Sequence, residues 1–515
     1  MFSEARFRMR EYLSLRLPPG APVRSLLAVF VGVLGVLVLA MLSSHFSPVL
    51  ALLGIVGMLV AAGMVISPPF AFVVMTTVMP WQRIGRFTRD SAAYAISLSR
   101  IFGAVGILAL IIHALIRHWK LKFGLPFYLF AGYTVIAAAS ITWAMRPGDA
   151  KRDALRIFGN LLFFFLMVNL VSSMRLVKLA VAAWLLSTVL TCVYTTYDYY
   201  SPNIPEVKYS QMGTTKDRFT AVLTDNSEIQ TIGHAVKRAY GPTEHPTLYG
   251  LYLTMTIPFW FFFMRIRKNQ PWFKLLLIGC LALVTFNILL ANTRAVILLA
   301  IGTYAYCFLR KLIDQRWRMA GLTFVLLLVA IPFIPKGVYQ RALNPELYTE
   351  AHGAGIRARF LLLDKSFILV QQHWLGGVGA GNQAILPHMI KREVIGNPTP
   401  AGLRAGAHDD FVQTLVETGI FAWLFFFSFV GLVTWSSFKA AWYFRHWEET
   451  EEHYWLMIAC QTVMVGILFF ALQTEVFHLP LAGWWFSAAL SVAFLDQARR
   501  MAEEPAEADL MELAA

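Results

Sequence analysis

Long apolar runs alternate with short polar connections along almost the whole chain. A helix needs roughly 20 predominantly apolar residues to cross a bilayer, and about 17 are tolerated. The pattern therefore predicts an all-α, polytopic membrane bundle with about 14 membrane segments. The predicted segments are Leu26–Leu42, Val49–Ile66, Phe70–Trp81, Leu98–Ile116, Pro126–Trp143, Ile157–Val171, Leu176–Tyr197, Pro246–Met264, Phe273–Ala291, Ala295–Leu309, Met319–Phe333, Ile420–Phe438, Tyr454–Leu472 and Pro480–Leu495.

The third of these segments, Phe70–Trp81, is short for a crossing and follows Ser67-Pro68-Pro69. Because proline breaks or kinks a helix, the segment is a tilted half-helix, a re-entrant piece or the end of a kinked span. The total therefore lies at about 12 to 14 segments by the length rule.

One polar stretch, Lys336–Gly419, interrupts the apolar pattern, and we expect it to contain short helices and the active site. It contains an apolar-periodic helix at Ile356–Trp374, which we expect to lie in the membrane interface. A glycine cluster at Gly376–Gly381 follows. The cluster lacks the G-K-[ST] ending of a phosphate loop, so it predicts a tight turn.

Composition agrees with a membrane protein, because the 515 residues are 57% hydrophobic and only 14% charged. The net charge of +14 resides in short basic runs between apolar segments, where it orients helices and meets anionic lipid. No separate basic domain is present, so no nucleic-acid partner is expected. The four cysteines lie inside apolar segments without C-x-x-C spacing, which argues against disulfides and a zinc site.

Basic runs also predict the orientation of the helices. Residues 1–24 carry five arginines and precede a first membrane helix rather than a cleaved signal peptide, so we expect them in the cytoplasm. If Phe70–Trp81 crosses, the basic connections and the acidic tail at 496–515 also fall in the cytoplasm, while Lys336–Gly419 and Asp198–His245 face outward. We expect Asp198–His245 to be a loop with short helical pieces. The cytoplasmic basic groups are Arg117/Lys120/Lys122, Arg175/Lys178, Arg265/Arg267/Lys268/Lys274, Arg310/Lys311/Arg316/Arg318, Lys439/Arg445 and Arg499/Arg500.

Arginines remain in the outward connections, where they bring no advantage for orientation. They include Arg238, Arg294, Arg357, Arg359 and Arg404. Guanidinium forks at phosphate depth bind pyrophosphate in bidentate fashion, so the set indicates an anionic ligand at the outer membrane boundary. The alternative is that each side chain snorkels to lipid phosphate.

His408 is the candidate catalytic base. Asp409 and Asp410 follow it, and Phe411 and Leu415 continue at helical spacing, so the histidine is expected to open a helix. A helix N-terminus lowers the pKa of a histidine and adjacent carboxylates raise it, a balance that can leave a neutral imidazole. A structural histidine at the membrane boundary is the alternative. No D-x-D occurs in the chain, so no metal site for a nucleotide sugar is expected.

Four stretches follow one another in a characteristic order: Gly241-Pro-Thr-Glu-His-Pro246-Thr-Leu-Tyr-Gly, Ala291-Asn-Thr-Arg294-Ala, Arg359 through Trp374-Leu-Gly-Gly377-Val-Gly379, and Ala407-His408-Asp-Asp-Phe-Val-Gln-Thr-Leu-Val-Glu417-Thr-Gly419. In this order they resemble the O-antigen ligase and polymerase family of bacterial membrane glycosyltransferases. The likeness covers about 241–495, which we take as one domain after the membrane helices of 25–240. Asp409 departs from the asparagine that is usual in the family.

The resemblance implies an inverting, metal-independent glycosyl transfer without a cofactor, on the periplasmic side of the bacterial inner membrane. The donor would be a glycan on undecaprenyl diphosphate, and the acceptor a lipid A core sugar, a second lipid-linked glycan, or a protein serine or threonine. His408 would be the base, and Arg294 and Arg359 would neutralise the departing diphosphate. The substrate-binding candidates are Arg238, Arg357, Arg404 and Glu417.

The competing class is a flippase or exporter of lipid-linked glycans. Such a protein should place charges along a central path through the bilayer. Ionisable residues in the middle of the predicted segments are few, and His113 is the clearest. The pattern therefore favours an enzyme.

Overall fold

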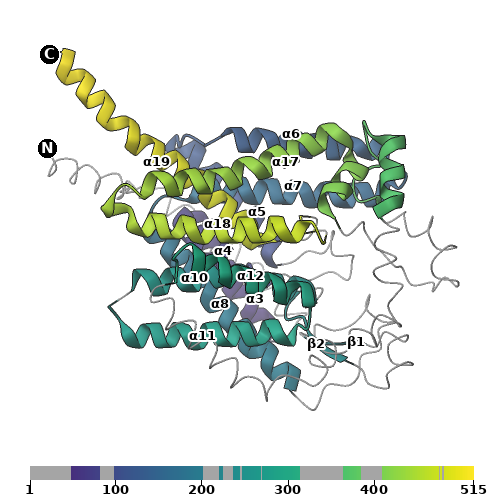
Figure 1. The fold of residues 1–515 in the computed structure, drawn as a ribbon, viewed down its shortest axis with the longest axis horizontal. Coiled ribbons are helices and arrows are strands. Elements are labelled where there is room, and N and C mark those ends of the chain that lie inside the picture. Colours follow the sequence, from purple (N-terminus) through teal and green to yellow (C-terminus); the bar gives the residue numbers. More distant parts are fainter. Residues whose placement is uncertain are drawn as a thin grey trace.

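The computed structural model describes residues 48–81, 98–200, 220–223, 236–243, 246–267, 269–313, 363–383, 409–474, 476–477 and 481–514. Long helices lie side by side and form an all-α membrane bundle, as predicted (Figure 1). Every predicted segment within the described residues overlaps a helix. Leu26–Leu42 and Met319–Phe333 lie outside those residues.

The bundle is built from helices of very different length. In the described part of the chain, eight helices are long and apolar enough to cross a membrane, and the total of about 14 segments stays a prediction. The helices are α3 (Pro48–Ile66), α4 (Pro68–Thr77), α5 (Leu98–Arg117), α6 (Leu125–Ala139), α7 (Pro147–Leu170), α8 (Met174–Tyr200), α10 (Pro246–Ile266), α11 (Pro271–Leu290), α12 (Arg294–Leu309), α17 (Asp410–Phe444), α18 (Glu451–Ala471) and α19 (Ala482–Ala514), with 3-10 turns η1 (Ser140–Thr142) and η5 (Glu448–Thr450).

Strands replace part of the predicted outer loop. Strand β1 (Thr220–Leu223) pairs antiparallel with β2 (Val236–Ala239), and Ala221 lies opposite Arg238. The expectation of loop with short helical pieces over Asp198–His245 is therefore wrong at these strands. A four-residue strand is stabilised by its partner more than by its own pattern, which is why local spacing did not reveal it.

The Ser67-Pro68-Pro69 break separates α3 from α4. Helix α4 has 10 residues, about 15 Å, so it reaches only half of a hydrocarbon core about 30 Å thick. Because Pro69 has no N–H, the carbonyl of Val65 loses its helical donor. The His113 Nε2 lies 2.9 Å from that carbonyl and must be the donor, since a carbonyl only accepts. His113 of α5 therefore replaces the hydrogen-bond donor that Pro69 cannot supply.

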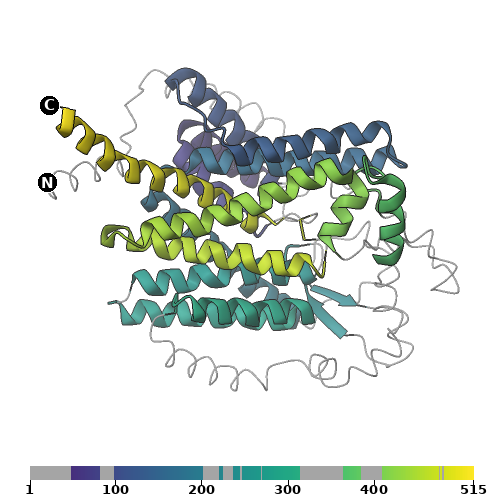
Figure 2. The same cartoon turned by 45° about the horizontal axis from the view of Figure 1, so that its top comes forward.

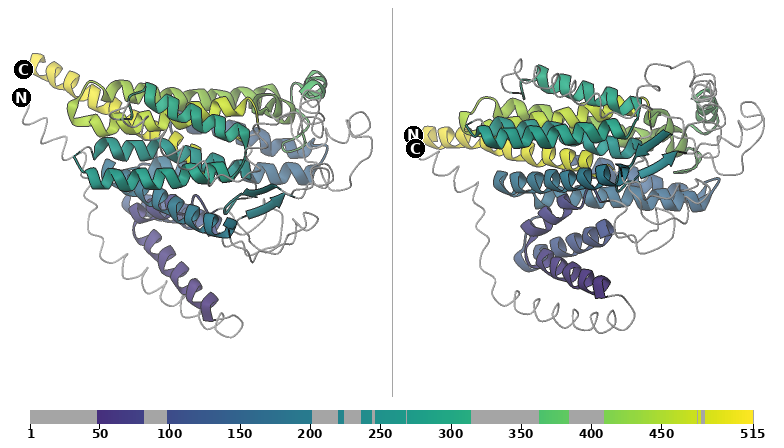
Figure 3. Two further views of the ribbon diagram at one scale, coloured as in Figure 1. Left: turned by 60° about the horizontal axis from the view of Figure 1, so that its bottom comes forward. Right: turned by 90° about the horizontal axis from the view of Figure 1, so that it is seen from below.

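The connections between helices gather at two opposite ends of the bundle (Figures 1 and 3). The basic end holds the described residues 118–124, 171–173, 267, 269–270, 310–313 and 445–450. The hairpin end holds the described residues 140–146, 291–293, 472–474, 476–477 and 481, together with the start of α17 and strands β1 and β2, which Figure 2 shows together.

Ion pairs join helices across the basic end. The Lys178 Nζ lies 2.7 Å from the Glu452 carboxylate, and the Lys122 Nζ lies 3.6 Å from that of Asp496. Exposed tryptophans mark both ends, as they do at the two interfaces of a bilayer: Trp143 and Trp374 at the hairpin end, and Trp272, Trp442 and Trp447 at the basic end.

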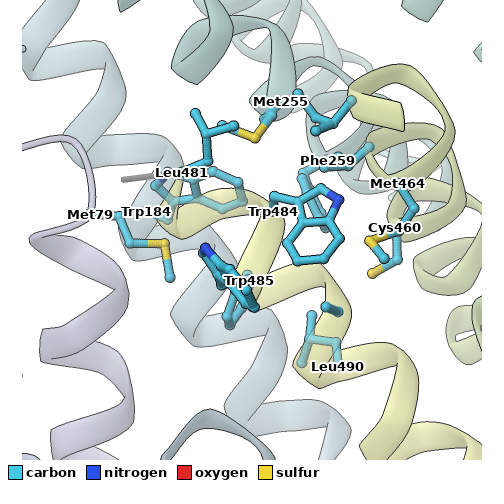
Figure 4. Packing of buried hydrophobic residues seen from close by; sticks show 14 of the residues in the cluster. Met79, Trp184, Met255, Phe259, Cys460, Met464, Leu481, Trp484, Trp485 and Leu490 are labelled. Atoms are coloured by element: carbon cyan, nitrogen blue, oxygen red, sulfur yellow. The ribbon is translucent and has the colours of Figure 1, made fainter. Parts of the chain in front are cut away.

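Aromatic side chains fill the centre of the bundle (Figure 4). Trp184 of α8 and Trp484 and Trp485 of α19 are buried there. The ring centroid of Trp184 is 5.2 Å from that of Phe259, and that of Trp485 is 4.8 Å from that of Phe130. The first contact joins α8 to α10 and the second joins α6 to α19, while the ring centroid of Trp184 also lies 5.8 Å from that of Phe486 of α19. The first turn of α19 is thus held by packing just inside the hairpin end.

Candidate active site

Helix α17 begins at Asp410, two residues after His408, close to where the sequence predicts a helix start. Asp409 is its N-cap residue, and the Asp409 Oδ1 accepts hydrogen bonds from the backbone N–H groups of Phe411 (2.8 Å) and Val412 (3.0 Å). Aspartate and asparagine cap helices about equally well. The departure from the family pattern at this position therefore keeps the cap, and it adds a negative charge beside His408.

A break at Gly419 separates the first two turns of α17 from its membrane-crossing part. Gly419 has φ 75° and ψ 179°, a combination that is open essentially only to glycine. The Ile420 N–H turns to the Trp374 carbonyl, 2.9 Å away. Residues 410–418 are thus a short helix of their own, and the predicted span Ile420–Phe438 begins immediately after the break.

This short helix buries a polar stripe. Asp410, Gln413, Thr414 and Glu417 are spaced i, i+3, i+4 and i+7, so they share one face, and all four are buried. Of the apolar residues between them, Phe411, Val412 and Leu415 are only half-buried, whereas Val416 is buried. Polar side chains turned inward are expected where a membrane helix faces a polar interior. The apolar positions that predict this helix do not reveal the stripe, although its i, i+3, i+4 and i+7 spacing is visible in the sequence.

Glu417 ties this helix to the glycine turn, which we define as residues 374–383. The Glu417 side chain is 1% exposed. Its Oε2 accepts from the Gly381 N–H at 2.9 Å, and its Oε1 accepts from the Gln413 Nε2 at 3.1 Å. The Glu417 carbonyl also accepts from the Gly379 N–H at 2.9 Å. The carboxylate is thus directed toward groups of the protein, and its predicted role in substrate binding stays a prediction.

The glycine turn needs glycine for its close approach to α17. Gly377, Gly379 and Gly381 all have positive φ. A Cβ atom on Gly377 would lie 2.4 Å from the Glu417 carbonyl oxygen, and one on Gly379 would lie 2.4 Å from the Ala144 Cβ. The tight turn predicted for the glycine cluster is confirmed.

The other side of the glycine turn binds the connection between α6 and α7. The Trp143 Nε1 donates to the Gly376 carbonyl at 3.0 Å. The Arg146 N–H donates to the Asn382 Oδ1 at 2.6 Å. The turn therefore joins the α6–α7 connection to the short helix at 410–418.

Arg238 and Arg294 come together at the same end of the bundle. Arg238, on β2, is 7% exposed. Its Nε donates to the Ala291 carbonyl at 3.2 Å, and its Nη2 donates to the Thr293 Oγ1 at 2.6 Å. Thr293 is the N-cap residue of α12, and Arg294 is the first residue of that helix. Two of the predicted arginines therefore flank one turn.

Further arginines on α7 are paired with acids of the same helix. Arg152 lies 3.3 Å from the Asp149 carboxylate, and Arg156 pairs with Asp153. Carboxylates of the same helix therefore balance both charges.

The other predicted site residues, His408, Arg357, Arg359 and Arg404, lie outside the described residues. Residues 363–373, the described part of the predicted interfacial helix, are helical, and Phe367 of this helix is exposed. Within the described ranges, no three His, Cys, Asp or Glu side chains come close enough together to hold a metal ion. Metal independence stays a prediction.

Comparison with known proteins locates one family domain. Residues 259–427 match the model of the O-antigen ligase family. No curated protein matches the chain. The matched segment runs from α10 to α17 and contains Arg294, the glycine turn and the polar stripe. The predicted resemblance is therefore confirmed, and residues 259–427 of this multi-pass membrane protein belong to the O-antigen ligase family.

Proposed function

We propose that the protein transfers or polymerises a glycan carried on undecaprenyl diphosphate, in the manner of an O-antigen ligase. One observation carries the proposal: the turn at 291–293, which holds Arg238 and opens α12 at Arg294, lies at the same end of the bundle as the start of α17. In the sequence, His408 lies two residues before that start. This arrangement supports a base and guanidinium groups acting at one end of the bundle.

The reaction needs one base and one anion site. The acceptor hydroxyl oxygen attacks the anomeric carbon of the donor, and its proton passes to the imidazole of His408. The bond from the anomeric carbon to the diphosphate oxygen breaks, and its electron pair leaves with the diphosphate. Attack from the opposite face inverts the anomeric configuration. Arg294 and Arg359 stabilise the charge that develops on the leaving diphosphate.

The remaining predicted residues take supporting roles in this proposal. Arg238 donates to the turn before Arg294, so it holds that turn while its charge adds to the anion site. Arg357 and Arg404 bind the diphosphate or the glycan from the polar stretch. Glu417 acts through the glycine turn that its carboxylate holds.

We place the reaction on the periplasmic side of the inner membrane. The basic end carries the dense lysine and arginine clusters, and positive charge favours the cytoplasmic side. The hairpin end then faces the periplasm, where a lipid-linked glycan presents its diphosphate at the membrane surface.

The acceptor distinguishes three forms of the proposal: a lipid A core sugar for a ligase, a second lipid-linked glycan for a polymerase, and a serine or threonine hydroxyl for a protein glycosyltransferase. A flippase of lipid-linked glycans is the alternative of another class. The bond between His113 and the Val65 carbonyl favours the enzyme, because it gives this mid-segment histidine a structural task.

The test measures release of undecaprenyl diphosphate by purified protein from an undecaprenyl-diphosphate glycan, with each acceptor in turn and no added metal. His408→Ala should abolish release while the protein stays folded. His446→Ala is the matched control, because His446 is exposed at the basic end and should be dispensable. Full turnover by His408→Ala would refute the mechanism, and glycan translocation without release would support the flippase.

A further inference from the structure

Asp410 is a buried carboxylate that the proposed chemistry does not use. The side chain is 0% exposed. Its Oδ2 accepts hydrogen bonds from two consecutive backbone N–H groups, those of Val476 at 2.5 Å and Phe477 at 3.1 Å. Successive amides that converge on one anion form a nest. Burying a carboxylate costs free energy unless such donors compensate it, so the nest is what allows Asp410 its position.

The nest belongs to the rigid core of the bundle. It lies in the connection between α18 and α19, and the ring centroid of Phe477 is 5.0 Å from that of Trp484 and 5.3 Å from that of Phe426. The hydrogen bonds of Asp410, the first residue of α17, therefore connect the start of this helix to the aromatic centre of the bundle.

Glu417 fastens the other end of the same short helix. It lies seven residues after Asp410, two helical turns along the same face, and it binds the glycine turn. The Asp409 carboxylate caps its own helix. Two carboxylates on one face thus fix both the position and the rotation of residues 410–418, and the chain enters this fixed helix from His408.

We propose that Asp410 is a positioning residue: its bond to the nest at Val476 and Phe477 sets where His408 stands relative to Arg294. The proposal rests on the proposed function in taking His408 as the base. Asp410 acts through the helix start and touches neither donor nor acceptor.

Two substitutions separate position from charge. Asp410→Asn keeps an acceptor oxygen at the same distance from the backbone, so it should retain most of kcat. Asp410→Glu keeps the charge but adds one methylene, about 1.5 Å of chain, which displaces the helix start. Since a misplacement of about 1 Å can cost about 10²-fold, we expect kcat to fall about that far with the KM for the donor almost unchanged.

The control is Glu452→Gln, which removes a carboxylate that also joins two helices, through Lys178, but at the basic end. It should leave kcat unchanged. A result in which Asp410→Glu retains kcat and Asp410→Asn loses it would overturn the proposal, because the charge itself would then matter. The proposal would also be overturned if Asp410→Glu raised the KM for the donor and left kcat unchanged.

Hydrogen exchange at the amides of 411–418 gives a readout that does not depend on the reaction. These amides should exchange faster in Asp410→Glu than in the wild type and in Asp410→Asn. If the wild type releases no undecaprenyl diphosphate, the proposed function fails. Hydrogen exchange still tests whether the hydrogen bonds of Asp410 to Val476 and Phe477 hold the start of α17. Unchanged exchange in Asp410→Glu would refute the claim that Asp410 holds the start of α17 in place.

Discussion

Gly419→Ala should destabilise the protein more than any other alanine substitution at a glycine of α17. The Gly419 backbone, at φ 75° and ψ 179°, lies in a region that costs other residues about 1–3 kcal/mol. A Cβ atom there would lie 2.1 Å from the Leu375 carbonyl oxygen. That oxygen belongs to the backbone, so it cannot rotate away as the end of a side chain would.

Relief of this clash must separate α17 from the glycine turn. The hydrogen bond from the Ile420 N–H to the Trp374 carbonyl would then be lost, at a net cost of about 1 kcal/mol. Adding the backbone strain, we expect the free energy of unfolding to fall by about 2–4 kcal/mol. Glycosyl transfer should fall as well, because residues 410–418 lose one of their supports.

Gly431→Ala is the matched control on the same helix. Its Cβ would meet nothing within 4 Å, so alanine should be neutral or stabilise the helix by about 0.5–1 kcal/mol. Unfolding of both variants and the wild type in a denaturing-detergent titration, followed by tryptophan fluorescence, measures the difference. Equal stability of the two variants would mean that α17 continues unbroken through residue 419, and the separate short helix would be refuted.

Three further predictions concern single side chains. Asp409→Ala should lower stability by about 0.5–2 kcal/mol while Asp409→Asn should not; equal melting temperatures of the two variants would contradict the cap. Arg238→Lys keeps the charge but loses the guanidinium that donates to both Ala291 and Thr293, so the transfer rate should fall. A rate equal to that of the wild type would show that the charge alone suffices. His113→Ala should lower stability by about 1–3 kcal/mol, because the Val65 carbonyl loses its donor. Transfer by the folded fraction should stay unchanged. A loss of transfer without a loss of stability would instead support a transport path through His113.

Much of the helical architecture could be predicted from hydropathy alone. The predicted Pro246–Met264 and Ala295–Leu309 correspond to α10 (Pro246–Ile266) and α12 (Arg294–Leu309). A bilayer requires an apolar run of similar length from every crossing helix. Each such helix can therefore be predicted from the sequence of its own segment. The start of α17 was also predictable, because helix caps have a local signature.

Contacts between distant residues could not be predicted in the same way. Asp410 binds an amide 66 residues further along, and Arg238 reaches a carbonyl 53 residues away. No local pattern specifies such partners. The excess of outward arginines did suggest that Arg238 and Arg294 serve one anionic ligand, and the structure brings both to one turn.

The two arginines at the ends of α12 allow the central claim to be tested on one helix. Arg294 begins α12 at the hairpin end, whereas Arg310 follows its last residue at the basic end, with its guanidinium 5.9 Å from the centroids of Tyr306 and Phe438. The measurement is the rate of undecaprenyl diphosphate release by Arg294→Ala and Arg310→Ala. Because Arg294 would stabilise the charge on the leaving diphosphate, Arg294→Ala should lower the rate by about 10²-fold or more, whereas Arg310→Ala should keep a rate close to wild type. Full activity of Arg294→Ala, or equal losses in the two variants, would contradict an anion site at the hairpin end.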